Sequence, residues 1–298
     1  MQIMKGRILY TLLSFATLFT YGQQSATISD YLPIDRYNNG DLLFNQLAVN
    51  PAWGSDSILI QGRAQLQEQW IGFSESPVEQ NFTISGHIPG TMHRAGIEVE
   101  WWGNRSIRNR LVRFNYRYLY VIDSRQSIIG GVNLDLASLK MDEIHGLVLA
   151  DSSQSFFTPN LHLGVQYRYN RWTLGAAYGG LFKNELEGER YNYLVSERSL
   201  LLNYSSWTRI GAIFRFSSDV VLATNFEKLS YFIATRFTWK DMITGGVFYN
   251  SYNKSKGLLF SGLFFDHFEI GYQFYFNAIE DQLLGGHSVF LGYRLYSE

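Results

Sequence analysis

Charged side chains at alternating positions are the residues of this sequence best suited to chemistry. Glu98 and Glu100 share one parity, and Arg113 and Arg117 share one parity in a later segment. In an extended chain, residues of one parity lie on one face, so charges on neighbouring strands meet across a wall. Two uses fit, namely cross-strand ion pairs that brace the wall, which we favour, or an ion-selective path. The predicted set of inward charges is Arg63, Glu98, Glu100, Arg113, Arg117, Asp135, Arg168, Arg209, Arg215, Arg236, Glu269 and Arg294.

Motifs for catalysis or metal binding are not found in the sequence. It contains no Gly-rich phosphate loop, no G-x-S-x-G elbow and no H-E-x-x-H pair. The six histidines are isolated from one another, and the chain has no cysteine, which excludes disulfides, thiolate metal sites and a lipid anchor on an N-terminal cysteine. We therefore predict no catalytic residue, no metal and no cofactor.

The composition favours strands. Of 298 residues, 17% are charged and 16% are aromatic, with 27 Gly and 5 Pro. The charged fraction lies below the roughly 25% of soluble domains, and aromatic side chains fit a pleated surface. The formal net charge of −1 gives no reason to expect a nucleic acid partner.

The N-terminus has the features of an export signal. Lys5 and Arg7 precede an uncharged apolar stretch over residues 8–20, and small residues at Thr20 and Gly22 suit a cleavage site. Residues 1–22 are therefore predicted to be a secretory signal peptide. The alternative is an N-terminal membrane anchor, for which the apolar run is short.

Alternation with period two runs through the rest of the chain. Residues 161–169 read Leu-His-Leu-Gly-Val-Gln-Tyr-Arg-Tyr, and residues 268–276 read Phe-Glu-Ile-Gly-Tyr-Gln-Phe-Tyr-Phe. Period two indicates strands rather than amphipathic helices. About fourteen such segments have the ~9–11 residues that cross a bilayer as a strand. They are expected at 57–66, 80–88, 94–102, 109–122, 126–138, 160–170, 171–182, 205–217, 218–227, 229–239, 242–252, 256–266, 267–277 and 285–297.

The connections between these segments alternate between short and long. Every second connection is short, at 89–93, 123–125, 170–171, 217–218, 240–241 and 266–267, whereas the long ones fall near 67–79, 139–159, 183–204 and 278–284. Barrels of the outer membrane have short periplasmic turns and longer outside loops. The pattern predicts a closed antiparallel transmembrane β-barrel of about 14 strands over residues 57–298, embedded in outer-membrane lipid.

Residues 23–56 do not alternate and are predicted to form a periplasmic N-terminal arm or plug, with a flexible leader as the alternative. The segment contains Asn50-Pro51-Ala52-Trp53-Gly54. Pro51 fixes its own φ and biases Asn50 to an extended conformation, and Trp53 suits a membrane interface or a lumen wall. This motif is interpreted either as a rigid entry to the first strand or as a binding site for a partner.

The motif, Asn50 to Ser55, resembles the opening signature of the PorP/SprF family of type IX secretion system membrane proteins. Gln69, Trp70 and Gly72 follow at the expected place, as do Pro159-Asn160 and a Gly164-bearing strand. The stretch 102–106 departs from the Asp and Gly that members often carry after the third strand, which leaves the identity of the cargo in doubt. The resemblance extends over essentially the whole mature chain.

The resemblance implies a non-enzymatic outer-membrane barrel that supports secretion or surface anchoring of a large, adhesin-like protein, as in gliding motility. The implied partners are the C-terminal sorting domain of that secreted protein, at 67–79, 139–159 and 183–204, and periplasmic secretion components at 23–56. An outer-membrane diffusion porin with a charged lumen is the alternative. A third hypothesis is an outer-membrane hydrolase, which nothing in the sequence favours.

Overall fold

The structure is a computed structural model that describes residues 49–54, 58–69, 78–103, 107–141, 154–182, 184–187, 192–196, 199–226, 229–251, 254–279 and 282–296. The predicted signal peptide, most of the segment 23–56, and Trp70 and Gly72 of the motif lie outside the described residues. No helix among the described residues is long and apolar enough to cross a membrane.

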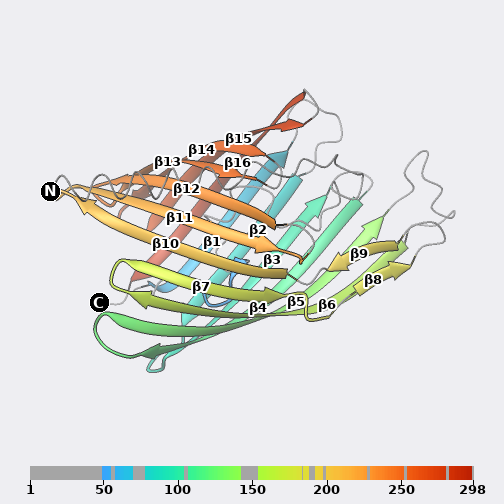
Figure 1. The fold of residues 1–298 in the computed structure, drawn as a ribbon, viewed down its shortest axis with the longest axis horizontal. Coiled ribbons are helices and arrows are strands. Elements are labelled where there is room, and N and C mark those ends of the chain that lie inside the picture. Colours follow the sequence, from blue (N-terminus) through green and yellow to red (C-terminus); the bar gives the residue numbers. More distant parts are fainter. Residues whose placement is uncertain are drawn as a thin grey trace. The chain divides into compact units, whose positions relative to one another are not determined.

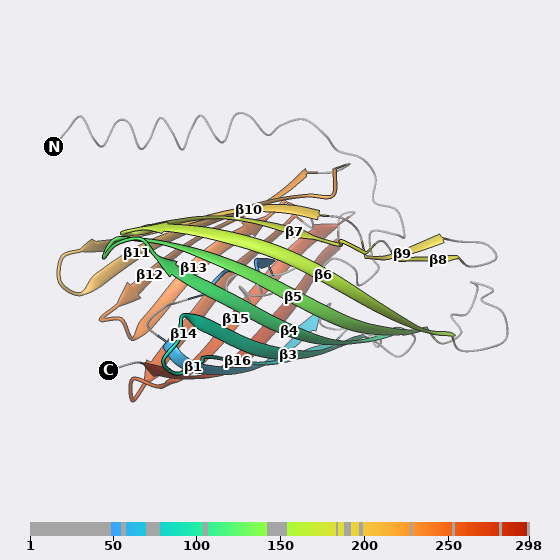
Figure 2. The same cartoon turned by 90° about the horizontal axis from the view of Figure 1, so that it is seen from below.

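Fourteen strands form a closed antiparallel barrel in which β1 pairs with both β2 and β16. Figures 1 and 2 show the arrangement of the strands from two directions. The strands are β1 (Ile58–Gln69), β2 (Val78–His87), β3 (His93–Gly103), β4 (Ile107–Val121), β5 (Gln126–Met141), β6 (Gln154–Tyr169), β7 (Trp172–Gly179), β10 (Ser199–Ile210), β11 (Phe214–Thr224), β12 (Leu229–Trp239), β13 (Ile243–Asn250), β14 (Ser255–Phe264), β15 (Phe268–Ile279) and β16 (Gln282–Tyr296). The predicted fold is confirmed, because each expected segment overlaps one of these strands.

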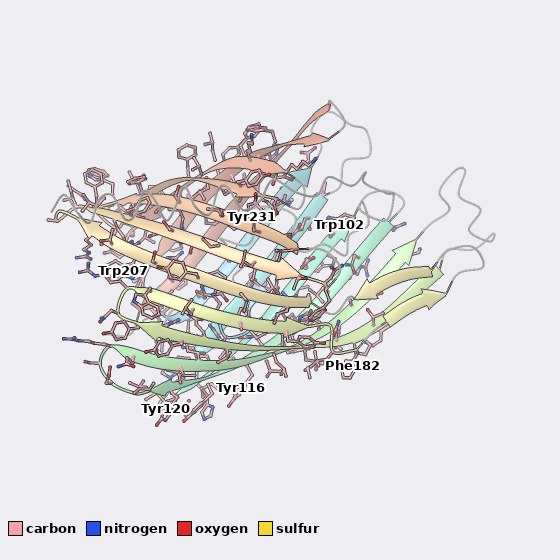
Figure 3. All side chains as sticks on the ribbon, viewed as in Figure 1. Trp102, Tyr116, Tyr120, Phe182, Trp207 and Tyr231 are labelled. Atoms are coloured by element: carbon pink, nitrogen blue, oxygen red, sulfur yellow. The ribbon has the colours of Figure 1, made fainter. Side chains whose placement is uncertain are left out.

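Parity along each strand separates the two faces of the wall. In β4, Arg113, Asn115 and Arg117 are buried, while Phe114 and Tyr116 between them are exposed. Figure 3 shows aromatic side chains such as Tyr116 projecting away from the barrel. Lipid therefore meets the apolar face, and the polar groups lie inside, where they avoid the desolvation that charges undergo in a bilayer.

Short turns join the strands at the end of the barrel where β16 finishes. Lys240 and Asp241 both have positive φ, as do Phe265 and Asp266. Two successive residues with positive φ form the type I′ turn, which matches the twist of the flanking strands. These two connections agree with the expected short turns at 240–241 and 266–267.

One expected turn is wrong. Ser217 and Ser218 do not turn but lie inside β11, where Ser218 pairs with Ser206 and Thr235. The chain reverses instead at Gly211, whose φ is 67°. Glycine adopts this left-handed conformation without a Cβ clash, whereas the serine pair carries only a weak turn preference that pairing on both sides overrides.

The structure also departs from the expected outer loops. A separate hairpin of β8 (Asn184–Glu187) and β9 (Asn192–Ser196) lies within the predicted loop 183–204. β5 and β6 have 16 residues each and continue their ladder to Met141 and Gln154. The predicted loop 139–159 therefore begins and ends as strand.

Candidate functional site in the barrel lumen

Residues 49–54 of the predicted arm lie against the inner face of the barrel wall. The side chains of Val49, Asn50, Ala52 and Trp53 are all buried, and Asn50 and Ala52 have no exposed area. Their partners come from β4, β5, β6, β7 and β10. The motif identified in the sequence is therefore a segment held inside the barrel, and we call residues 49–54 the lumen segment.

Asn50 anchors the lumen segment through its side-chain amide. Its Nδ2 donates to Oδ1 of Asn203 at 2.9 Å and to the carbonyl oxygens of Val165 and Ala176 at 3.3 and 3.4 Å. Its Oδ1 accepts a hydrogen bond from the backbone N–H of Ala52 at 2.9 Å, inside the segment. The amide thus bridges β6, β7 and β10, and its short side chain also fixes the local turn before Trp53.

Glycines on the wall make room for this approach. A Cβ added at Gly131 would lie 2.4 Å from the carbonyl carbon of Pro51, and one at Gly164 would lie 2.1 Å from Oδ1 of Asn50. A Cβ at Gly175 would lie 2.7 Å from Nδ2 of Asn50. Real Cβ atoms do not come this close, so these positions need glycine for the backbones to touch. Gly131 and Gly164 are paired across β5 and β6.

The carbonyl groups of the lumen segment accept hydrogen bonds from three wall side chains. Asn115 donates to the Pro51 carbonyl at 3.1 Å, and Arg117 Nη1 donates to the Trp53 carbonyl at 2.7 Å. The amide of Gln166, with its nitrogen turned inward, donates to the Ala52 carbonyl at 2.7 Å. Buried carbonyl groups need such partners, and here the wall supplies one for each of three successive residues.

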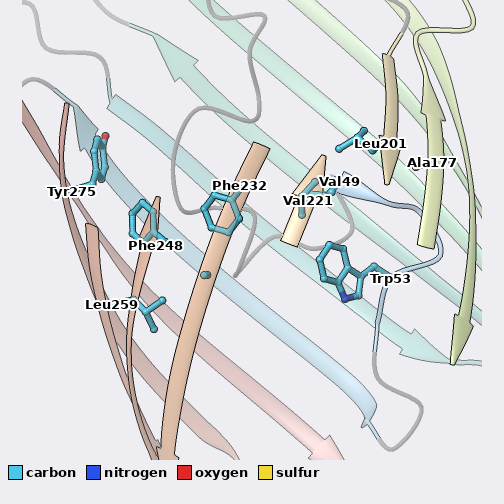
Figure 4. Packing of buried hydrophobic residues seen from close by; sticks show 10 residues of the cluster. Val49, Trp53, Ala177, Leu201, Val221, Phe232, Phe248, Leu259 and Tyr275 are labelled. Atoms are coloured by element: carbon cyan, nitrogen blue, oxygen red, sulfur yellow. The ribbon is translucent and has the colours of Figure 1, made fainter. Parts of the chain in front are cut away.

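Apolar side chains cover the opposite part of the lumen. Val49 and Trp53 belong to a buried cluster with residues of β7 and β10 to β15 (Figure 4). Its other members are Ala177, Leu201, Val221, Phe232, Ala234, Phe248, Leu259 and Tyr275. The interior of a porin is polar and filled with water, so an apolar cluster that buries its side chains indicates a packed interior at this level.

A buried charge network lies beside the lumen segment. Arg113 donates through Nε and Nη2 to both carboxylate oxygens of Asp135, at 2.8 and 3.1 Å, and through Nη1 to Glu98 at 2.6 Å. His162 Nε2 lies 3.1 Å from the second oxygen of Asp135. The register pairs Arg113 with both Glu98 and Asp135, one inward position beyond Asn115. Inward polar side chains from four neighbouring strands thus form one network.

The remaining predicted charges form smaller groups. Arg63 and Arg294 both donate to Glu269, and Arg236 donates to Asp219 at 2.7 Å. Arg209 and Arg215 lie toward the short-turn end, where both contact Asp241 and are much more exposed. Glu100 and Arg168 are half-buried on the inward face.

Several wall residues of this site were not singled out from the sequence. Asn115, Gly131, Gln166 and Asn203 all contact the lumen segment or its anchor. Their shared signal is parity, because polar or small residues at inward positions follow the same alternation as the arginines. Gln69, which was predicted as part of the motif, ends β1.

Among the described residues, no group of three or more His, Cys, Asp or Glu side chains could hold a metal ion. The chemistry of the site is hydrogen bonding and charge pairing between a peptide segment and a barrel wall.

Residues 35–293 match the protein family described as type IX secretion system membrane protein PorP/SprF. No curated protein matches the chain in sequence. The family is one of secretion-system membrane proteins.

Solved structures with a similar fold are outer-membrane barrels. The toluene transporter TodX of Pseudomonas putida has a TM-score of 0.54 at 14% identity, with 86% of this chain and 93% of TodX covered. The toluene transporter TbuX of Ralstonia pickettii also has a TM-score of 0.54, at 10% identity and with 85% and 93% covered. Omp33 of Acinetobacter baumannii has a TM-score of 0.51 at 7% identity, with 80% and 100% covered. At sequence identities this low, the comparisons show similarity of fold only.

Proposed function

Because the chain belongs to the PorP/SprF family of type IX secretion system membrane proteins, we propose that it is an accessory barrel that supports the secretion or surface anchoring of a large, adhesin-like cargo protein. Its place is the outer membrane. The role is non-enzymatic, since the chemistry of the site is that of holding a peptide segment. The family membership carries this proposal, and the packed interior supports it.

The interior argues for a barrel that holds partners rather than one that passes solutes. The lumen segment is bound by Asn115, Arg117, Gln166 and Asn203, and Trp53 packs into the apolar cluster on the other side. A diffusion porin needs a continuous water path, which this packing would narrow. The charged residues mostly pair with one another inside the wall, as expected for braces.

The two ends of the barrel offer two surfaces. Outer-membrane barrels place their short turns in the periplasm, so the long connections at 67–79, 139–159 and 183–204 would face outward, toward the C-terminal sorting domain of the cargo. The part of the segment 23–56 that precedes the lumen segment, together with the short turns, would face periplasmic components of the secretion machine. One chain would thus link an outside protein to an inside machine.

Deleting the gene in its native host tests this role. The expected result is loss of at least one large protein from the cell surface, with recovery when the intact gene is returned. Unchanged surface protein in the deletion strain would contradict the proposal.

Conductance measurements in a planar bilayer distinguish the proposed accessory barrel from a diffusion porin. The purified barrel is expected to give no stable conductance steps, because the lumen segment and the apolar cluster narrow the water path. Regular steps whose ion selectivity changes with Arg168→Ala would favour the porin instead.

A further inference from the structure

One edge of β6 extends beyond its neighbour (Figures 1 and 2). β6 pairs with β5 from Gln154 to Tyr169, whereas its pairing with β7 begins only at Leu163. Beyond it, the carbonyl of Leu161 accepts from the N–H of Leu181 at 3.4 Å. Within the described chain, no strand continues this ladder toward Gln154.

Odd-numbered residues of β6 turn their main-chain groups toward this edge. The N–H and C=O of one residue point to the same side of an antiparallel strand, and Leu161 bonds on the β7 side. Ser155, Phe157 and Pro159 therefore face the edge, and the even-numbered residues bond to β5. Pro159 fits this assignment, because a proline in a sheet is tolerated where its missing N–H faces away from the partner strand.

The projecting edge stands outside the membrane. A strand crosses the bilayer with ~9–11 residues, and β6 has 16. Counted from the short turn after Tyr169, a crossing of this length ends between Leu161 and Pro159, before Gln154–Thr158 is reached. Lipid would leave open main-chain groups unsatisfied, whereas on the outer side a second polypeptide can pair with them.

We propose that the Ser155–Phe157 edge of β6 binds an extended segment of the secreted cargo protein as an added β-strand. The inference rests on the proposed function, which puts the cargo at this end of the barrel. The main-chain groups of the edge select an extended polypeptide. Phe157, with 67% of its area exposed, adds an apolar contact on the outward face. Pro159 ends the stretch that can pair, which keeps the added strand short.

Photo-crosslinking in the native host tests where the cargo lies. Full-length protein carrying Phe157→benzoylphenylalanine is illuminated in the outer membrane, and the adducts are identified by mass spectrometry. The expected adduct is the surface protein that is lost when the gene is deleted. An adduct only with a second copy, an adduct only within the chain, or no adduct would overturn the proposal.

Main-chain variants test the hydrogen bonds themselves. Ser155→Pro with Phe157→Pro removes two N–H donors from the edge and leaves the β5 ladder intact. The matched control Phe157→Ala shortens the side chain and keeps the N–H. Folding is checked by the heat-dependent gel mobility of the barrel. Two lost hydrogen bonds predict about tenfold less cargo retained on the cell, with a smaller loss for the control.

The deletion strain and the double proline variant distinguish failure of the accessory role from failure of strand addition. If deletion of the gene abolishes cargo export but the folded double proline variant retains cargo normally, the strand-addition proposal is wrong and the accessory role stands. If deletion changes nothing, the proposed function fails first.

Discussion

Replacing Arg113 with methionine removes the guanidinium group between the carboxylates of Glu98 and Asp135. All three side chains are at most 3% exposed. Arg113 donates three hydrogen bonds to them, two in a bidentate pair with Asp135. Methionine fills a similar length but offers no donor. Two carboxylates then remain buried, with Asn81 and His162 among their other partners.

The free energy of unfolding that Arg113→Met is expected to lose follows from the burial of these charges. Removing one partner of a buried ion pair destabilises a protein by about 3–5 kcal/mol, because the remaining charge stays desolvated. Exposed pairs contribute less than about 1 kcal/mol. Arg209 provides the matched control, since its side chain is 57% exposed and its pair with Asp241 lies at the short-turn end of the barrel.

Urea unfolding of the refolded barrel in lipid vesicles, followed by tryptophan fluorescence, measures both variants. We expect Arg113→Met to lower the free energy of unfolding by about 3–5 kcal/mol and Arg209→Met by less than about 1 kcal/mol. Adding Glu98→Gln and Asp135→Asn to Arg113→Met should recover most of the loss. Equal losses in the free energy of unfolding for Arg113→Met and Arg209→Met would contradict this prediction, because burial of the ion pair would then make no difference.

Three further predictions concern the lumen segment, one turn and the lipid face. The chain has no cysteine, so Ala52→Cys, at a position with no exposed area, should resist maleimide labelling in the folded barrel. Adding Gly131→Ala, which crowds Pro51, should speed labelling at least tenfold. Equal labelling rates would contradict the burial of the lumen segment against the wall. Gly211→Ala should lower the free energy of unfolding by about 1 kcal/mol because the φ of Gly211 is positive, whereas Gly130→Ala, with open space around it, should not. Urea unfolding measures both variants, and equal free energies of unfolding would contradict a left-handed turn at Gly211. Phe260→Arg puts a charge on the lipid face near the middle of β14 and should lower the same free energy by about 2–4 kcal/mol, while a neutral effect would place that face outside lipid.

The fold was predictable because alternation is a local property of the sequence. Each crossing strand shows its two faces through parity, as Arg113 and Phe114 do. The predicted turn at Ser217 and Ser218 was wrong because it relied on a local turn preference. That preference is weak compared with the pairing of β11 to strands on both of its edges. The glycine of the real turn, Gly211, has a positive φ, as Gly90 and Gly180 do, and the sequence does not display this conformation.

The site was predictable only in part. The motif Asn50–Gly54 and the inward arginines were identified, and the structure joins them, since Arg117 donates to the Trp53 carbonyl. Which wall residues receive Asn50 depends on the register of β6, β7 and β10 and on how deep the segment lies. Those are long-range properties, so Asn203, 153 positions away from Asn50, carries no local signal of its contact.

Crosslinking mass spectrometry on the detergent-extracted protein from its native host is the most direct test of the accessory role. Lys140 and Lys256 lie near the long-connection end, and Lys240 lies in a short turn. We predict crosslinks from Lys140 or Lys256 to the C-terminal domain of a secreted surface protein, and from Lys240 to periplasmic secretion components. A barrel recovered alone, with no crosslink at either end, would contradict it.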